Sequence, residues 1–235
     1  MTIASTEPPQ QAPSAAPKIK VKTTWPVVPP SINRTPIRTE RLLLRPFAAT
    51  DVEAIHELRR QPEVMQWTIA GLVDKTTDET RVFIERFLPP KDLASYNFVV
   101  VYLGEAGDVV IGCGGCGVIK PELGWPEVGY MFRKEYWGMG FGTEFLRGLT
   151  AAWWALPRRE VELEVELESV RDGDAAIRAP EVLVAVIENG NVGSRRVLEK
   201  AGFAEYKRWT EPDSRAGFEG ADASLVKFRL EAPGS

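Results

Sequence analysis

The stretch that decides the fold runs from Glu127 to Leu149 and reads EVGYMFRKEYWGMGFGTEFLRGL. A strand-like run comes first, three glycines follow, and apolar residues then recur at helical spacing. The backbone N–H groups of a helix's first turn have no intrahelical partner, and the helix dipole adds partial positive charge there. Glycines remove the Cβ atoms that would hold an anion away. The stretch therefore predicts a phosphate or pyrophosphate cradle at Gly138, Gly140 and Gly142, although a tight turn uses glycines in the same way.

Two familiar nucleotide-binding patterns do not fit this cradle. A dinucleotide-binding fingerprint lies in an early strand–helix–strand unit and is followed about 20 residues later by an acidic residue. Here the glycines come after several strands, beyond the middle of the chain. The loop also lacks the lysine that a P-loop places beside its phosphates. Neither of these nucleotide-binding folds is therefore expected.

Strand-like and helix-like patterns are mixed on both sides of the cradle. Thr50 and Glu53 form a capping-box pattern that predicts the start of one helix. Thr76 and Glu79 repeat the pattern for the next, and Asn191 is the N-cap candidate of the last helix. Strands are expected over 41–47, 96–103, 109–119, 127–132, 161–167, 181–187 and 224–230, and helices over 50–60, 76–88, 142–156 and 191–203. This mixture predicts an α/β (α+β) domain with flanking helices on a mostly antiparallel sheet.

Composition along the chain sets the expected boundaries. Residues 1–36 are rich in Pro, Gln, Ser and Ala and are predicted to form a disordered tail, although Trp25, Val27 and Val28 could dock on the domain. Residues 37–231 are predicted to form a single domain. From Val161 to Glu168, valine or leucine alternates with glutamate at the period of a strand. The glutamates predict a solvated hairpin face, or alternatively a rim that attracts a cationic acceptor or a partner chain.

Charge and cysteine content argue against several function classes. The net charge is −4 and the isoelectric point about 5.3, whereas a general nucleic-acid binder should be basic. No apolar run approaches the roughly 20 residues that span a bilayer, and the N-terminus lacks the pattern of a secretory signal, so a cytoplasmic protein is expected. Cys113 and Cys116 form a CxxC pattern, but His56 is the only histidine and the pair sits in a strand-like run. Two small structural thiols are predicted, and no metal site.

Three blocks of the sequence resemble the GNAT acetyltransferases. The stretch from 127 to 149 resembles motif A of that family, a strand, a Q/R-x-x-G-x-G/A loop and a helix, with Trp137 where many members have Gln or Arg. NVGSRRVLEKAGF, residues 191–203, is similar to the second signature of the branch that includes the ribosomal-protein N-terminal acetyltransferases. TERLLLRPFAATDVEAI, residues 39–55, resembles the opening strand and helix of that branch. The blocks follow the family's order and cover most of residues 38–230.

This resemblance implies a GNAT-type fold, in which the sheet splays between two parallel central strands to admit acetyl-CoA. Backbone amides of the glycine loop would hold the pyrophosphate, the preceding strand would pair with the pantetheine arm, and the cap of the last helix would contact the cofactor. Loops such as 66–76 and 205–222 would form the acceptor side, and the acidic segment near 158–180 would be an insertion. The implied cofactor-binding residues are Tyr130, Met131, Phe132, Arg133, Gly138, Met139, Gly140, Phe141, Gly142, Thr143 and Asn191.

The family's chemistry needs a base for the amine and a proton for the leaving thiolate. Glu127 is the candidate base, because it starts the cofactor strand beside the expected splay; a solvent-exposed strand-end carboxylate is the alternative interpretation. Many members use a helix tyrosine as the acid, but the corresponding residue here is Leu198. Ser194 is the substitute that the ribosomal branch suggests, or else a structural first-turn hydroxyl. His56 would line the acceptor groove if the first helix borders it, and is otherwise inert.

The leading hypothesis is an acetyl-CoA-dependent N-acetyltransferase that acts by direct attack of a primary amine, with a small-molecule amine or an undefined acceptor. A protein N-terminus is the alternative acceptor. A non-catalytic acyl-CoA-binding regulatory domain is an alternative of another class, since the helix tyrosine is missing. A redox or zinc protein built on the CxxC pattern is a third. The expected partners are an amine substrate and no nucleic acid or membrane, in a monomer or homodimer.

Overall fold

A five-stranded antiparallel sheet forms the first half of the molecule. The computed structural model describes residues 17–170, 178–218 and 220–233. The sheet has the strand order β2-β3-β4-β5-β6, and each neighbouring pair is antiparallel. Its strands are β2 (Ile37–Arg38), β3 (Leu42–Arg45), β4 (Tyr96–Gly104), β5 (Gly107–Cys116) and β6 (Val128–Phe132). The strand β6 lies at one edge, so one side of its backbone is left without a partner in this sheet.

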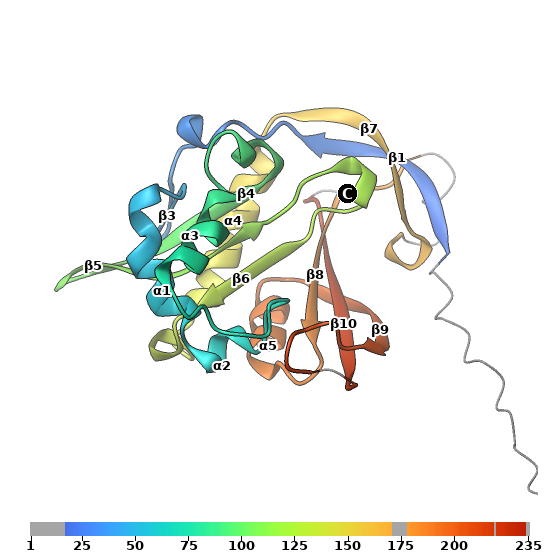
Figure 1. Cartoon of the computed structure of the whole chain (residues 1–235). Coiled ribbons are helices and arrows are strands. Elements are labelled where there is room, and N and C mark those ends of the chain that lie inside the picture. Colours follow the sequence, from blue (N-terminus) through green and yellow to red (C-terminus); the bar gives the residue numbers. More distant parts are fainter. Residues whose placement is uncertain (1–16, 171–177, 219, 234–235) are drawn as a thin grey trace, which may run out of the picture.

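A second antiparallel sheet meets the first at a single point. Its order is β8-β10-β9, with β8 (Val182–Glu188), β9 (Ala204–Pro212) and β10 (Asp222–Glu231). One parallel bridge joins Glu127, just before β6, to Val184 of β8, and the Val184 N–H donates to the Pro126 carbonyl at 2.9 Å. Beyond this bridge β6 and β8 diverge (Figure 1). The predicted mostly antiparallel fold with two splayed parallel central strands is therefore confirmed.

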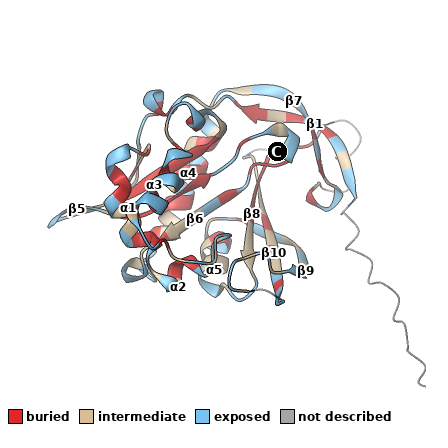
Figure 2. Ribbon diagram, viewed as in Figure 1, coloured by how far each residue is buried: buried red, intermediate tan, exposed pale blue. Residues whose placement is uncertain are grey.

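Helices cover both faces of the five-stranded sheet. They are α1 (Val52–Arg59), α2 (Pro62–Met65), α3 (Thr77–Glu85), α4 (Phe141–Ala155) and α5 (Val192–Lys200), with 3-10 turns at Ser31–Asn33, Ala49–Asp51, Lys91–Ala94, Pro121–Leu123, Lys134–Tyr136 and Leu167–Ser169. Val99 and Val101 of β4 pack with α1 and α3, while Phe98 and Val100 pack with α4. Figure 2 shows the resulting buried residues on the strands and on the inner sides of the helices. None of the described helices is long and apolar enough to cross a membrane.

The N-terminal segment corrects two predictions. Residues 18–26 form β1 (Lys18–Pro26), which pairs antiparallel with β7 (Arg158–Glu166), the acidic strand; the two lie side by side in Figure 1. Lys20 lies opposite Glu164 and Lys22 opposite Glu162, while Val21, Trp25, Leu163 and Val165 are buried on the other side of the ribbon. The predicted disorder is therefore wrong for Lys18–Pro26, and the acidic strand faces a lysine strand. Residues 1–16 of the predicted tail and residues 171–177 of the predicted insertion lie outside the described residues.

The remaining sequence predictions are mostly local ones. The capping box of Thr76 and Glu79 is confirmed, with the Glu79 N–H donating to the Thr76 hydroxyl at 3.3 Å. The box expected at Thr50 is wrong, because a 3-10 turn precedes α1 and the Asp51 carboxylate accepts the Ala48 N–H at 2.8 Å. Besides β1, three further helices or strands were not predicted: the short strand β2, the short helix α2 and the strand β9. The strand β9 occupies part of the loop expected over 205–222.

Both cysteines are buried structural residues. Cys113 packs in the core under α1 and α3, and Cys116 packs in the core that α4 shares. Burial raises the pKa of both thiols, to about 12 for Cys113. Thiols held protonated in this way are poor nucleophiles and poor metal ligands, in agreement with the structural role that the sequence predicted. Within the described ranges, no cluster of three or more His, Cys, Asp or Glu is placed to hold a metal ion.

Candidate active site

The predicted cradle is a left-handed loop at the start of α4. Gly138 and Gly140 have φ angles of +76° and +85°, a region that residues with a Cβ rarely adopt. A Cβ on Gly138 would meet nothing within 4 Å, and one on Gly140 would meet only an Arg41 nitrogen, at 3.5 Å. No side-chain hydrogen bond caps α4. The loop therefore presents an open surface next to the first-turn N–H groups of a 15-residue helix, as an anion site requires.

Gly142, the third glycine, has a packing role and not a loop role. Gly142 lies inside the first turn of α4, and a Cβ there would meet the Val197 methyl carbons of α5 at 3.1 and 3.3 Å. Gly142 thus allows the first turn of α4 to pack closely against Val197 of α5. The sequence reasoning had treated the three glycines as equivalent. The structure separates two loop glycines, which shape the cradle, from one packing glycine, which brings α5 beside it.

A cation that the sequence reasoning missed lies beside the cradle. The Arg41 guanidinium donates to the Met139 carbonyl at 3.2 Å, pairs with Glu144 at 2.7 Å and stacks on the Phe141 ring at 4.4 Å from its centroid. Its side chain keeps 39% of its surface exposed. Trp137 also holds the loop, because its indole N–H donates to the Phe132 carbonyl at 2.8 Å. The only signal for Arg41 was its place in the opening block of the family resemblance.

One face of β6 meets the first turn of α5. Val128, Tyr130 and Phe132 point toward the core that α4 and α5 share. The Tyr130 hydroxyl donates to the Ser194 carbonyl at 3.4 Å, so its side chain reaches across the splay. The Asn191 carboxamide oxygen accepts the Ser194 N–H at 2.9 Å, which confirms the predicted N-cap. The structure therefore brings Tyr130, Asn191 and Ser194 together.

The opposite face of β6 carries the candidate base. Met131 packs in the core under α1 and α3, so the alternation of the strand places Glu127 on that same side. Glu127 is exposed, as the alternative interpretation of a strand-end carboxylate expects, but the surrounding protein partly desolvates its carboxylate. This desolvation raises its pKa, and the charge of Lys227 only partly offsets the rise. Among the described residues, the Glu127 side chain has no hydrogen-bond or ion-pair partner; its backbone forms the bridge to Val184.

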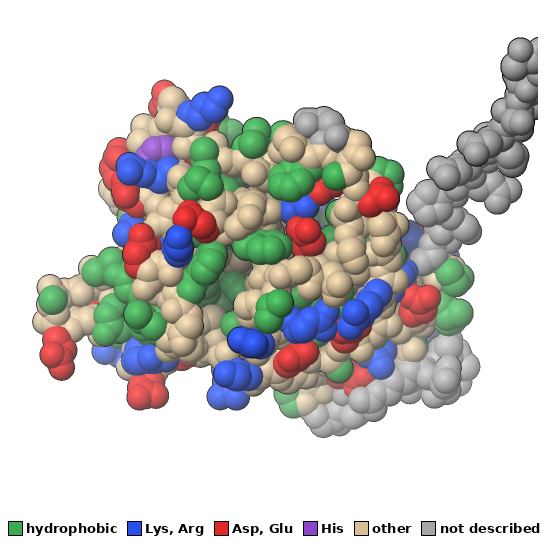
Figure 3. Space-filling view, turned by 90° about the horizontal axis from the view of Figure 1, so that it is seen from below, with side chains coloured by type: hydrophobic (Ala, Val, Ile, Leu, Met, Phe, Trp, Pro, Cys, Tyr) green, Lys and Arg blue, Asp and Glu red, His purple; other side chains and the backbone are tan. Residues whose placement is uncertain are grey.

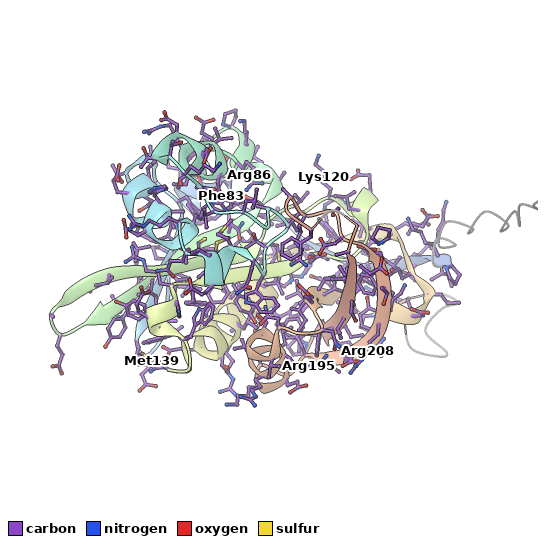
Figure 4. All side chains as sticks on the ribbon, turned by 60° about the horizontal axis from the view of Figure 1, so that its bottom comes forward. Phe83, Arg86, Lys120, Met139, Arg195 and Arg208 are labelled. Carbon is purple, nitrogen blue, oxygen red and sulfur yellow. The ribbon has the colours of Figure 1, made fainter. Side chains whose placement is uncertain are left out.

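Other predicted cofactor residues have structural side chains. Phe132 is buried against Phe145, and the Arg133 guanidinium donates to the Ala54 carbonyl of α1 at 2.9 Å. For these two, only backbone groups are available to pair with a cofactor. Figure 4 shows Met139 of the cradle and Arg195 of α5 on one side of the sheet and Phe83 of α3 on the other. The cradle and the first turn of α5 thus share the α4–α5 side.

A segment of α2 and its following turn, residues 61–72, crosses the open end of the splay. We call it the strap. At the β6 end, the Gln61 side chain accepts the Lys134 N–H at 2.8 Å, and Glu63 pairs with Lys134 at 2.6 Å. At the β8 end, the Trp67 ring lies close to Gly190, in the turn before α5. Figure 3 looks onto this end of the molecule and shows a hollow with apolar side chains around it. The strap therefore lies at the acceptor side that the resemblance implies.

Arg215 fastens the strap to the second half of the fold. Its guanidinium donates to the Gln66 carbonyl at 2.6 Å and to Glu188 of β8 at 2.8 Å, and it pairs with Asp213 at 2.5 Å. Only 12% of its side-chain surface is exposed. The strap backbone approaches closely here, because a Cβ on Gly71 would meet the Arg215 Cβ at 2.9 Å. Arg215 was not predicted, since the two partners that tie the strap to β8, Gln66 and Glu188, lie 149 and 27 residues away in the sequence.

His56 takes part in a network between α1 and α3. Its Nδ1 lies 2.9 Å from the Thr80 hydroxyl, which donates to Asp74 at 2.7 Å. Because that hydroxyl gives its proton to a carboxylate, its oxygen accepts from His56, and Nδ1 carries the ring proton. Arg59 completes the network with two bonds to Asp74, at 2.6 and 2.8 Å. These contacts assign His56 a structural role, the second of the two interpretations of the sequence.

Comparison with known proteins agrees with this geometry. Residues 41–204 match the family model of the acetyltransferase (GNAT) domain. An uncharacterized N-acetyltransferase p20 of Bacillus licheniformis is 28% identical over 133 residues, 56% of this chain and 73% of that protein. The solved structure of the ribosomal L7/L12 α-N-protein acetyltransferase RimL in complex with coenzyme A is 15% identical, with a TM-score of 0.63 over 86% of this chain and all of that one.

A second solved structure, spermidine N-acetyltransferase from Vibrio cholerae in complex with CoA and spermine, is also 15% identical, with a TM-score of 0.60 over 83% of this chain and 97% of that one. At these identities the two structures show a shared fold, which the splay between β6 and β8 already indicates. The family model covers well over half of the chain and includes the cradle, β6 and the first turn of α5. The chain therefore belongs to the GNAT acetyltransferase family and is an N-acetyltransferase.

Proposed function

We propose that this N-acetyltransferase uses acetyl-CoA and transfers the acetyl group to a primary amine by direct attack, without a covalent enzyme intermediate. The observation that carries the proposal is one continuous segment, the unpaired edge of β6 leading into the open cradle at Gly138 and Gly140. An edge strand offers N–H and C=O groups to an extended chain, and the cradle offers N–H groups to a pyrophosphate. Acetyl-CoA has both parts and supplies the activated thioester.

In this proposal, residues on the two faces of the splay have different roles. On the α4–α5 side, Asn191 caps the helix that lies beside the cradle, and Arg41 adds a positive charge next to the loop. On the opposite side, Glu127 takes the amine proton directly or through a water molecule. Its raised pKa suits this role, because a base is most effective when its pKa lies near the working pH. Ser194 is the second catalytic candidate, with its hydroxyl at the first turn of α5.

The acceptor is a small-molecule amine in this proposal, and a protein N-terminus is the alternative. RimL and spermidine N-acetyltransferase share the fold equally well, so the fold alone favours neither. The strap supports a small acceptor, because it encloses the open end of the splay from the side of Glu127. The family membership also favours a catalyst over the non-catalytic acyl-CoA-binding domain.

Acetylation of an amine panel tests this function. Purified full-length protein is incubated with acetyl-CoA and either small primary amines or N-terminal peptides, and both the released CoA thiol and the acetylated product are measured. The proposal expects amine-dependent thiol release, lost in Gly140→Glu, with small amines used better than peptides. Peptides used better would select the alternative acceptor, and acetyl-CoA binding without transfer to any amine would contradict the proposal.

A further inference from the structure

Tyr130 brings a hydroxyl into the splay where the reaction would occur. Its ring is fixed by Phe132 and Phe145, at centroid distances of 6.1 and 6.0 Å, and its hydroxyl reaches the Ser194 carbonyl of α5. This is a side-chain contact from β6 to the first turn of α5, on the cofactor side of the sheet. At 3.4 Å the hydrogen bond is long, so the hydroxyl can turn to a better acceptor at little cost.

Beyond its first turn, α5 has no hydroxyl group at the position where many family members have one. Leu198, at the position where many family members have a tyrosine, is fully buried in the core and has no proton to donate. Tyr130 reaches the same helix from the strand instead, at its first turn. The distance in sequence between Tyr130 and Ser194, 64 residues, hides this arrangement from motif analysis.

We propose that the Tyr130 hydroxyl donates a hydrogen bond to the sulfur of coenzyme A as the thioester is broken. The proposal rests on the acetyl-transfer function above. In the step, the amine nitrogen forms a bond to the acetyl carbon, the carbon–sulfur bond breaks, and the electron pair remains on sulfur. The amine proton passes to Glu127. The thiolate, stabilised by the Tyr130 O–H group, takes its proton from solvent as it leaves.

The ionisation of the phenol fits a donor that keeps its proton. Burial raises the pKa of Tyr130 to about 12, although the neighbouring Ser194 partly opposes the rise. The phenol is therefore protonated through neutral and moderately alkaline pH. A thiol ionises near pH 8.5, well below this value, so the phenol stabilises the thiolate through a hydrogen bond and does not transfer the proton to it. Hydrogen bonds to an ionised acceptor are roughly twice as strong as neutral ones.

Ionisation of bound coenzyme A tests this role without an acceptor. The ultraviolet absorbance of the thiolate is followed against pH for the free thiol and for its complexes with wild type, Tyr130→Phe and Ser194→Ala. The buried Cys113 and Cys116 do not interfere, because burial holds their pKa values above the range of the titration. Affinity for desulfo-coenzyme A, which lacks the sulfur, reports separately on the cradle and on folding.

We expect the bound thiol to ionise about one pH unit lower in wild type than in Tyr130→Phe, a tenfold stabilisation of the thiolate. Ser194→Ala should shift the ionisation of the bound thiol less than Tyr130→Phe does, because it keeps the Tyr130 hydroxyl and the backbone carbonyl that this hydroxyl contacts. Tyr130→Phe should bind desulfo-coenzyme A within about twofold of wild type. With an accepted amine, Tyr130→Phe should lower kcat by about tenfold and leave the KM for acetyl-CoA unchanged, since the interaction strengthens only as charge develops.

Each other outcome overturns a definite part of the account. Equal thiol ionisation in wild type and Tyr130→Phe, with desulfo-coenzyme A bound normally, would reject the role of Tyr130 and leave the proposed function intact. An effect found in Ser194→Ala and absent from Tyr130→Phe would assign the donor to Ser194. Failure of wild type to bind desulfo-coenzyme A would reject the cofactor site itself, and the role of Tyr130 with it.

Discussion

Glu127 is proposed as the base because its carboxylate has no cationic partner in direct contact among the described residues. Most other carboxylates near the splay have cationic partners: Glu188 and Asp213 share Arg215, and Glu166 pairs with two lysines. Glu127 has only the longer-range attraction of Lys227, and desolvation raises its pKa. The raised pKa suits the proposed role of Glu127 as a base, but ionising this partly desolvated carboxylate lowers the stability of the fold.

Replacing Glu127 by Gln should separate these two effects. The kcat for acetyl transfer should fall by about 10²- to 10⁴-fold, as for loss of a general base, while the Kd for acetyl-CoA stays unchanged. Because the folded-state pKa is raised, ionising Glu127 opposes folding above that pKa, and below the unfolded value the carboxyl is protonated in both states. The variant should therefore have a higher Tm than wild type at pH 8 and the same Tm at pH 3. An unchanged kcat would exclude Glu127 as the base.

Single residues also mark what the sequence could and could not predict. Asn191 and the pair Thr76 and Glu79 were predicted correctly, because a cap and its helix are neighbours in sequence. Arg41 and Tyr130 act through contacts 98 and 64 residues away, and no local pattern reports such distances. The glycine pattern before a helix predicted the cradle but did not distinguish the packing role of Gly142 from the loop roles of Gly138 and Gly140.

At the level of elements, the strap depends on one buried guanidinium. Arg215→Met keeps an unbranched side chain but removes the bonds to Gln66, Glu188 and Asp213. Glu188 and Asp213 then lose their shared cation, and the carbonyl of Gln66 loses its donor, so the strap is held less firmly to β8. We expect faster amide hydrogen exchange in residues 61–72 and a higher KM for the amine, with the Kd for acetyl-CoA unchanged.

Arg208→Met is the matched control for the strap. Arg208 lies on β9 with 57% of its side-chain surface exposed and bonds only to Glu205, three residues away. Its loss should change stability little, since the pair is exposed, and should leave exchange in the strap as it is in wild type. If Arg215→Met altered acetyl-CoA binding as much as amine use, the strap would not be an acceptor-side element.

The ribbon of β1 and β7 explains why two sequence predictions failed together. The lysines of β1 and the glutamates of β7 face each other on the exposed side, and either strand alone resembles a solvated, polar segment. The apolar side becomes clear only when the partners are joined: Trp25 keeps 3% of its surface exposed and Leu163 1%. The pairing spans more than 130 residues of sequence, so a tail and an insertion were predicted where one ribbon exists.

Burial and charge make unequal contributions to this ribbon. Trp25→Ala should lower the free energy of unfolding by about 3–5 kcal/mol, because it leaves a large cavity. Lys20→Ala should change it by less than about 0.5 kcal/mol, since its ion pair with Glu162 is 3.9 Å long and both side chains are mostly exposed. Urea unfolding of both variants checks the difference. Similar values for the two would mean that the apolar side of β1 does not stabilise the fold.

For the whole molecule, two antiparallel sheets meet at one parallel bridge and are held open beyond it. Everything proposed here depends on that opening: the unpaired edge of β6, the cradle at its end, Tyr130 and Ser194 on one side and Glu127 on the other. The sequence predicted this plan because the order of strands and helices, together with three family-like blocks, specifies it. It did not predict the strap or the ribbon of β1 and β7, since both are formed by contacts between residues far apart in the sequence.

The most direct test of the account is isothermal titration of acetyl-CoA into wild type, Gly140→Glu and Gly107→Glu. Both glycines have positive φ, and a Cβ meets nothing closer than 3.5 Å at either position, so both variants add a carboxylate at a left-handed position, but only Gly140 lies in the cradle. The account predicts saturable binding to wild type and Gly107→Glu, and none to Gly140→Glu, with circular dichroism showing all three folded. Equal binding by Gly140→Glu and wild type would contradict the assignment of the cradle, and no binding by wild type would contradict the assignment of the cofactor.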